Sequence, residues 1–274
     1  MTAARRAAVA ASVLLALAFL LLPIAALFSR VGPGRLAASA GERVFVDALL
    51  VSLKTSLIAH AFVLLVGTAA GYALGRARFR GRRALLAVVD LPLVLPPAVA
   101  GIALLATFGR NGLLGGALDL AGLRIPYTQA AVVLAVAFVE LPIYLKQAAV
   151  AFESVDAALL EAARTLGDGP ARVFRRVALP LAAPGLAAGS SLAWARGLGE
   201  FGATLMFAGS LQGVTQTLPL AIYAELNVDY SVALAIGALL VLVSVGVLLL
   251  VRLTPSWTRF ALISPIGFAT SRSS

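Results

Sequence analysis

Cysteine is absent from the 274 residues of the chain, and histidine and methionine are nearly so, with one and two copies. Disulfide bonds and thiolate chemistry are therefore excluded, and no metal site is expected because its usual ligands are missing. Charged residues make up only 12% of the chain, whereas soluble proteins average about 25%. A soluble globular domain is therefore excluded as well.

Apolar residues dominate instead, at 61% of the chain with a mean hydropathy of +0.99. They form blocks long enough to cross a bilayer core, which takes about 20 helical residues. The first block follows Arg5 and Arg6, and it is longer than the roughly 7–15-residue apolar core of a signal peptide, so we expect an uncleaved span. The sequence predicts an all-α integral membrane protein with six transmembrane helices, at Ala7–Phe28, Asp47–Leu74, Leu85–Phe108, Thr128–Ala149, Val177–Ala208 and Ser231–Val251.

The net charge of +10 comes from arginines that gather in alternate links between the apolar blocks. Membrane proteins keep Lys and Arg on the cytoplasmic side, so this pattern predicts that both termini are cytoplasmic. It also argues against nucleic acid binding, for which basic residues form one patch. The arginines assigned to the cytoplasmic side are Arg76, Arg78, Arg80, Arg82, Arg83, Arg164, Arg172, Arg175, Arg176, Arg252, Arg259 and Arg272.

One cytoplasmic link, residues 154–180, has the pattern of a helix, a turn and a second helix. Ser154 or Asp156 can cap the first helix, and Gly167 supplies a left-handed stop. Gly169-Pro170 begins the second helix, which Pro180 is expected to end. An apolar stripe on the first helix needs a surface to pack against, either the ends of the spans or a soluble partner. The stripe consists of Val155, Leu159, Ala162 and Leu166.

This link resembles the EAA loop of ABC importer permeases, written EAA-x3-G-x9-I-x-L-P. The matching residues are Glu161, Ala162, Ala163, Gly167, Leu179 and Pro180, and the one departure is the conservative Val177 in place of isoleucine. The resemblance implies a type I ABC importer permease fold, in which this loop is the coupling helix that docks into a cleft of an ATP-binding subunit. The loop is expected to span residues 152–180.

Three further stretches are similar to the molybdate branch of the sulfate, molybdate and tungstate permeases. They are Leu91–Gly101, Ala195–Gly209 and Thr215–Leu226. This resemblance implies a permease that carries a tetrahedral oxyanion, most simply molybdate, across the bacterial cytoplasmic membrane in multi-pass form. Sulfate, thiosulfate and tungstate remain alternatives.

The same resemblance implies the partners of the chain. They are a second copy of the chain, two ATP-binding subunits, an extracytoplasmic oxyanion-binding protein and the lipid bilayer. No cofactor is expected on this chain, because ATP and Mg belong to the ATP-binding subunits. The expected layout is an N-terminal helix and periplasmic loop over 1–46, a transmembrane core over 47–252 and a cytoplasmic tail over 253–274.

Prolines and glycines interrupt the third and fifth predicted spans. Broken helices occur in membranes mainly where the backbone faces protein or a water-filled cavity, so these spans are candidates for the translocation pathway. The alternative is that they only kink and pack closely. The candidate pathway or gate residues are Pro96, Pro97, Gly101, Arg196, Gly199, Glu200, Gly202 and Thr204.

Charged and polar residues within the spans are few. Arg196 and Glu200 share one helix face, and we expect Glu200 to pair with Arg196 or with hydroxyls such as that of Thr204, in a structural or gating role. Glu140 is expected to pair locally with Lys146 beside Pro142, and a contact within the gate is the alternative. His60 has no acidic neighbour in its own span, so we expect a neutral, packed side chain.

Other classes of membrane protein fit the sequence less well. A secondary transporter or channel needs ion relays or internal repeats, and neither is evident. A membrane enzyme needs a catalytic constellation that one histidine does not supply. The sequence GxxxxGK[ST] is absent, so another chain must hydrolyse ATP.

Overall fold

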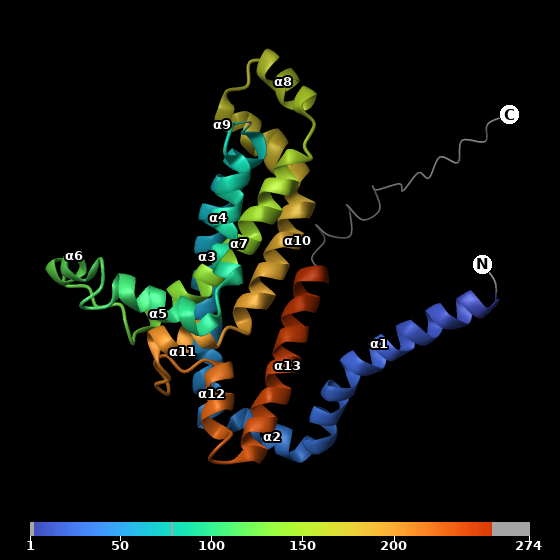
Figure 1. The fold of residues 1–274 in the computed structure, drawn as a ribbon, viewed down its shortest axis with the longest axis vertical. Helices are drawn as coiled ribbons and strands as arrows, with labels where there is room; N and C mark the ends of the chain where they lie inside the picture. The colour runs from blue at the N-terminus through green and yellow to red at the C-terminus, as the bar shows by residue number, and fades with distance from the viewer. Residues whose placement is uncertain (1–2, 78, 254–274) are drawn as a thin grey trace. The chain divides into compact units, whose positions relative to one another are not determined.

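The computed structural model describes residues 3–77 and 79–253, and all the regular structure in these two ranges is helical (Figure 1). The chain divides into two compact units. Among the described residues, the first consists of 3–52 and 210–243, and the second of 53–77, 79–209 and 244–253. The predicted all-α class is therefore confirmed for the part of the chain that is described.

The first unit contains α1 (Ala3–Arg30), α2 (Pro33–Gly41), the beginning of α3 (Arg43–Arg76), α12 (Leu218–Glu225) and most of α13 (Tyr230–Leu253). Its core joins the start of α3 to α12 and α13 through Phe45, Leu218 and Ile236. Most apolar side chains of α1 are exposed, for example Phe19 at 77%. In a membrane protein such a surface faces lipid or another chain rather than water.

The second unit holds the rest of α3 and the helices that carry the candidate sites. These are α4 (Arg82–Val94), α5 (Pro97–Phe108), α6 (Gly115–Leu120), α7 (Gln129–Glu153), α8 (Ala157–Thr165), α9 (Pro170–Val173), the π-helical turn η1 (Phe174–Ala178), α10 (Leu179–Leu198) and α11 (Gly202–Ala208).

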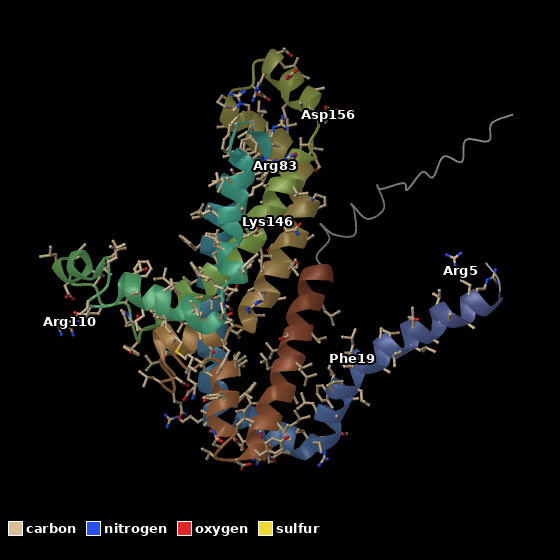
Figure 2. The ribbon with its side chains drawn as sticks, in the orientation of Figure 1. Arg5, Phe19, Arg83, Arg110, Lys146 and Asp156 are labelled. Carbon is tan, nitrogen blue, oxygen red and sulfur yellow. The ribbon has the colours of Figure 1, made fainter. Side chains whose placement is uncertain are left out.

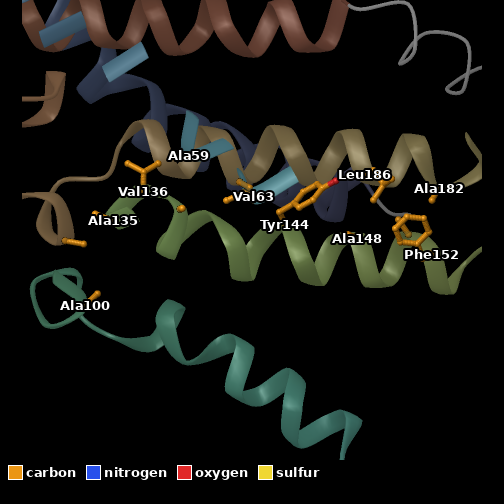
Figure 3. Packing of buried hydrophobic residues seen from close by; sticks show 14 of the residues in the cluster. Ala59, Val63, Ala100, Ala135, Val136, Tyr144, Ala148, Phe152, Ala182 and Leu186 are labelled. Atoms are coloured by element: carbon orange, nitrogen blue, oxygen red, sulfur yellow. The ribbon is translucent and has the colours of Figure 1, made fainter. Parts of the chain in front are cut away.

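Close packing of α3, α7 and α10 forms the core of the second unit (Figure 3). α3 carries a glycine at every fourth position, at Gly67, Gly71 and Gly75, on the face turned to α7. A methyl group at Gly71 would lie 2.5 Å from the Cβ atom of Ala148. Such rows of small residues let membrane helices approach closely enough for dispersion contacts to hold them together. Close van der Waals packing, rather than a hydrophobic effect between helices, stabilises this core.

The spans differ in part from those predicted. Four described helices are long and apolar enough to cross a membrane, or up to five when the bent pair α4 and α5 counts as one. The predicted third span is broken, because α4 and α5 meet at 107° where Pro96 and Pro97 interrupt the helical hydrogen bonds. The predicted fifth span stops at Leu198 and resumes as α11. The sixth predicted span corresponds to the apolar helix α13.

Pro180 does not end the second helix of the 152–180 loop, so that prediction is wrong. One continuous helical segment runs from Pro170 to Leu198. The reason is the π-helical turn η1, after which the N–H group of Leu179 bonds to the carbonyl of Phe174. A proline at the first turn of a helix needs no N–H donor of its own. The wider turn therefore joins the loop to α10 without a break.

Candidate functional site

The 152–180 loop, here called the coupling loop, folds as the helix–turn–helix that the sequence predicts. The Asp156 carboxylate caps α8 by accepting the N–H group of Ala158 at 2.9 Å. Gly167 ends α8 in the left-handed region at φ +91°, and the next N–H group, of Asp168, bonds back to Ala163 at 3.1 Å. This geometry satisfies carbonyl groups at the helix end and requires a residue that tolerates positive φ.

The apolar stripe predicted on α8 is only partly buried. Val155 is buried, but Leu159 and Leu166 are 49% and 87% exposed. Leu160, which the helical spacing did not select, is buried instead, as is Val173 of α9. Leu160 and Val173 are thus buried within the helix–turn–helix. Leu159 and Leu166 form an exposed apolar surface that another molecule can cover.

The motif residues of the coupling loop lie mostly on its outside. Glu161, Ala162, Gly167 and Pro180 are exposed, whereas Ala163 and Leu179 are half-buried and pack against the core of the second unit. The outer residues are accessible to a partner, and the inner ones pack the loop against the hydrophobic core.

The arginine-rich link between α3 and α4 lies beside the coupling loop. The Arg76 guanidinium donates to the Val155 carbonyl at 3.1 Å, and that of Arg82 donates to the Glu153 carboxylate at 2.7 Å. Arg83 and Asp156 accordingly lie at the same end of the second unit (Figure 2). Residues of both segments line a pocket of about 970 Å³. The two links that the charge pattern assigns to one side of the membrane are thus neighbours.

The breaks in the third and fifth predicted spans lie against each other. A methyl group at Gly101 of α5 would lie 2.6 Å from the Ala203 carbonyl oxygen and 2.7 Å from the Met206 Cβ atom of α11. One at Gly202 would lie 2.6 Å from the Cβ atom of Pro97. The start of α5, with Pro96 as its N-cap residue, therefore packs on the start of α11 at a distance that only glycine permits.

Arg196 and Glu200 form the predicted ion pair, with 2.9 Å between the guanidinium and the carboxylate. Gly199, exposed between them, is the C-cap residue of α10. The other carboxylate oxygen of Glu200 accepts the N–H group of Ala203 at 2.9 Å, so Glu200 caps α11 across the break. Of the two kinds of partner predicted for Glu200, Arg196 is therefore the one observed. The Thr204 side chain is fully buried, and its hydroxyl group has no hydrogen-bond partner among the described residues.

The predicted pairing of Glu140 with Lys146 is wrong, whereas His60 is buried and packed as expected. Lys146 pairs with Asp90 at 2.9 Å, and Glu140 bonds to His60, with 2.8 Å from Oε2 to Nδ1. The second ring nitrogen of His60, Nε2, lies 2.9 Å from the Ser190 hydroxyl group. These three residues belong to α7, α3 and α10. Spacing along one helix could not reveal their contact, and two isolated polar residues in separate spans were the only available signal.

No metal centre accompanies these residues: in residues 3–77 and 79–253, no group of three or more His, Cys, Asp or Glu side chains is placed to hold an ion. The second unit thus presents an exposed helix–turn–helix loop at one end, a break where α5 packs on α11, and a polar contact between α3, α7 and α10. A loop that can bind a soluble partner, joined by one helix to a break within the membrane, suits a transport subunit.

The chain belongs to the family described as binding-protein-dependent transport system inner membrane components, whose family model matches residues 64–259. It is 46% identical over 231 residues to the molybdenum transport system permease protein ModB of Mycobacterium tuberculosis. The matched residues cover 84% of this chain and 88% of the relative. It is 44% identical over 178 residues to the ModB protein of Escherichia coli K12, covering 65% of this chain and 78% of the relative.

Solved structures of ABC importers share the fold. A chain of the bacterial alginate ABC transporter, in complex with a pentasaccharide-bound periplasmic protein, superposes with a TM-score of 0.70 and 18% identity, covering 90% of this chain and 92% of the other. The MetNI methionine transporter gives a TM-score of 0.61 and 19% identity, covering 81% and 97%. The fold is therefore that of an ABC importer permease, and the chain is a transport subunit rather than an enzyme.

Proposed function

We propose that this chain is the permease subunit of an ABC importer that carries molybdate across the bacterial inner membrane by alternating access. The observation that carries the proposal is the 46% identity, over 84% of the chain, to a permease named for molybdenum transport. The capped coupling loop, with Gly167 at φ +91°, supports the mechanism. ATP hydrolysis, with its Mg²⁺, then takes place on a separate ATP-binding subunit and reaches this chain through the loop.

The proposed assembly contains two copies of this chain, two ATP-binding subunits and one extracytoplasmic oxyanion-binding protein. Leu159 and Leu166 offer an apolar surface where an ATP-binding subunit can dock on α8. Each copy crosses the membrane six times with both termini in the cytoplasm, so the coupling loop faces the ATP-binding subunits.

The proposed pathway runs beside the breaks at Leu95–Pro97 and Gly199–Phe201. A molybdate dianion is repelled by a free carboxylate, but both oxygens of Glu200 are engaged, one by Arg196 and one by the N–H group of Ala203. Half-helices at membrane depth bring backbone N–H groups to the pathway, and these suit an anion. Gly101 and Gly202 let the two breaks move as a packed pair.

Deletion of the gene for this chain is expected to abolish high-affinity molybdate uptake, measured with radioactive molybdate at low external concentration. Tungstate in excess is expected to compete with uptake in intact cells, because it is a tetrahedral dianion of nearly the same size. Sulfate at the same concentration is expected to leave uptake unchanged, since the external binding protein selects by size.

Complementation with the intact gene is the control for the deletion. Sulfate auxotrophy of the deletion strain with normal molybdoenzyme activity would mean that the transported ion is sulfate rather than molybdate. The assignment as an importer permease would still stand. Normal uptake of both ions by the deletion strain would contradict the oxyanion assignment.

Single cysteines on the cysteine-free chain test its orientation. Cysteine in place of Val228, which is 80% exposed, is expected to react with a membrane-impermeant thiol reagent in intact cells. Cysteine in place of Arg80, also exposed, is expected to react only after permeabilisation. Labelling of both sites after permeabilisation controls for access, and the reverse pattern in intact cells would invert the proposed topology.

A further inference from the structure

His60, Glu140 and Ser190, together called the three-helix network, link α3, α7 and α10 in the middle of the second unit. Glu140 is fully buried and His60 is 8% exposed. The Glu140 carboxylate lies 2.8 Å from Nδ1 of His60, and Nε2 lies 2.9 Å from the Ser190 hydroxyl group. A carboxylate only accepts, so Nδ1 carries a proton, and a neutral ring would then accept the Ser190 hydroxyl at Nε2.

Two further contacts connect the network to α10. The ring of Trp194 stacks on the His60 imidazole at 5.5 Å between centroids and 23° between planes. The Glu140 side chain lies directly against Gly197, where an added methyl group would collide with Oε1 and with Cδ. Ser190, Trp194 and Gly197 thus present one face of α10 to the network, and Gly197 lies within one turn of the break at Gly199.

The order of hydroxyl, imidazole and carboxylate is also that of a hydrolytic triad. Ser190 lies inside α10, however, where the N–H groups of the backbone are used within the helix. Backbone donors for an oxyanion are therefore missing beside its hydroxyl group. The network is therefore better understood as a structural contact between helices than as a catalytic triad.

One oxygen of the network is left without a partner. Oε1 of Glu140 is buried and makes no hydrogen bond within the ranges that the structure describes. A buried carboxylate that is incompletely bonded costs free energy, which a shift of the neighbouring helix can recover by supplying a donor. The backbone N–H groups of α10 are used within the helix, but the Trp194 indole N–H group on the same helix is also buried and without a hydrogen-bond partner in the described residues, so it can serve as that donor.

We infer that His60 and Glu140 are positioning residues that hold α10, and hence the gate at Gly199 and Glu200, in one of two alternative positions. The inference rests on the proposed transport function. During the cycle α10 moves along Glu140, the bond between His60 and Ser190 breaks, and Oε1 of Glu140 gains a donor. The network then couples movement of the coupling loop to opening of the break.

The test uses the full transporter in proteoliposomes, with its ATP-binding subunits and binding protein, and measures molybdate taken up per ATP hydrolysed. Glu140→Ala is expected to lower this ratio by about fivefold, which corresponds to the net contribution of one hydrogen bond. Glu140→Gln keeps the side-chain volume and the acceptor for His60. Its ratio is expected to stay close to that of the unmodified protein. Ser190→Ala, a smaller change, is expected to lower the ratio by about twofold.

Gly197→Ala is expected to lower the ratio because its methyl group displaces Glu140. Glu140→Ala in the same chain removes the collision, so the double variant is expected to have a higher ratio than Gly197→Ala alone. Such rescue depends on the contact between α7 and α10 and not on the general stability of the protein.

Tyr144→Phe is the matched control. It removes the 2.7 Å hydrogen bond between Tyr144 and Thr68, which also joins α7 to α3, and keeps the ring that packs beside α10. Its ratio is expected to match that of the unmodified protein. A ratio lowered as much as that of Glu140→Ala would mean that any bond between these helices matters, and would overturn the inference.

The remaining outcomes separate the inference from the proposed function. Unmodified protein that takes up no molybdate with its partners present would contradict the function. Uptake by the unmodified protein together with unchanged ratios in Glu140→Ala and Ser190→Ala would contradict the inference alone. Should Glu140→Ala fail to insert, Ser190→Ala still decides it, because a ratio equal to that of the unmodified protein would overturn the inference.

Discussion

Gly167→Val is expected to abolish transport while the protein still inserts into the membrane. The residue lies at φ +91°, and a β-branched side chain there costs of order 1–2 kcal/mol. The chain avoids this cost by leaving the left-handed region, which tilts α8 away from the orientation that its cap at Asp156 fixes. The measurements are molybdate uptake and copurification of the ATP-binding subunit, and both are expected to fall.

Gly169→Ala is the control for this variant. Gly169 lies two residues further on at φ −69°, and nothing lies within 4 Å of an added methyl group. This variant is expected to transport as the unmodified protein does. Full transport by Gly167→Val would mean that the coupling loop transmits nothing to the pathway.

Gly101→Leu is expected to eliminate transport and to lower the thermal stability of the purified protein. The Cβ atom alone would lie 2.6 Å from the Ala203 carbonyl oxygen and 3.0 Å from the Ala203 Cα atom. Backbone atoms cannot move aside as a side chain can, so α5 must separate from α11. Overpacking of this kind costs about 1–3 kcal/mol or more. Uptake and the temperature of half-unfolding in detergent measure the two effects.

Gly116→Leu separates the effect of added volume from that of its position. An added methyl group at Gly116, in α6, meets nothing within 4 Å, so uptake and stability are expected to stay unchanged. Normal uptake by Gly101→Leu would contradict the view that α5 and α11 move as a packed pair.

The fold class, the coupling loop and one ion pair could be predicted from the sequence because each depends on local spacing. A cap at Asp156 and a left-handed glycine at Gly167 are decided within a few residues, and both lie where expected. Arg196 and Glu200 are four residues apart on one helix, so their pairing follows from helical geometry.

The polar contacts between helices could not be predicted in the same way. His60 and Glu140 are separated by 80 residues, and their pairing depends on which faces of α3 and α7 meet. The row of small residues from Gly67 to Gly75 sets that choice, and one sequence does not identify its partner surface.

The path of the third span could not be predicted from the sequence either. Its length suited one crossing, and prolines at Pro96 and Pro97 indicated a kink, but the angle of 107° depends on the contact of α5 with α11. The prediction that Pro180 ends a helix fails for a related reason. A proline is tolerated in the first turn of a helix, and Pro180 lies in the first turn of α10, directly after the π-helical turn at Phe174–Ala178.

The absence of a break between the coupling loop and α10 makes the segment a lever. Its 29 residues, Pro170–Leu198, correspond to a rod roughly 43 Å long at 1.5 Å per residue. Tilting such a rod by about 5° about its loop end displaces the far end by about 4 Å, enough to pass one side chain over another. In the proposed function, a small rotation imposed on the coupling loop by an ATP-binding subunit is thereby magnified into a larger displacement at Gly199.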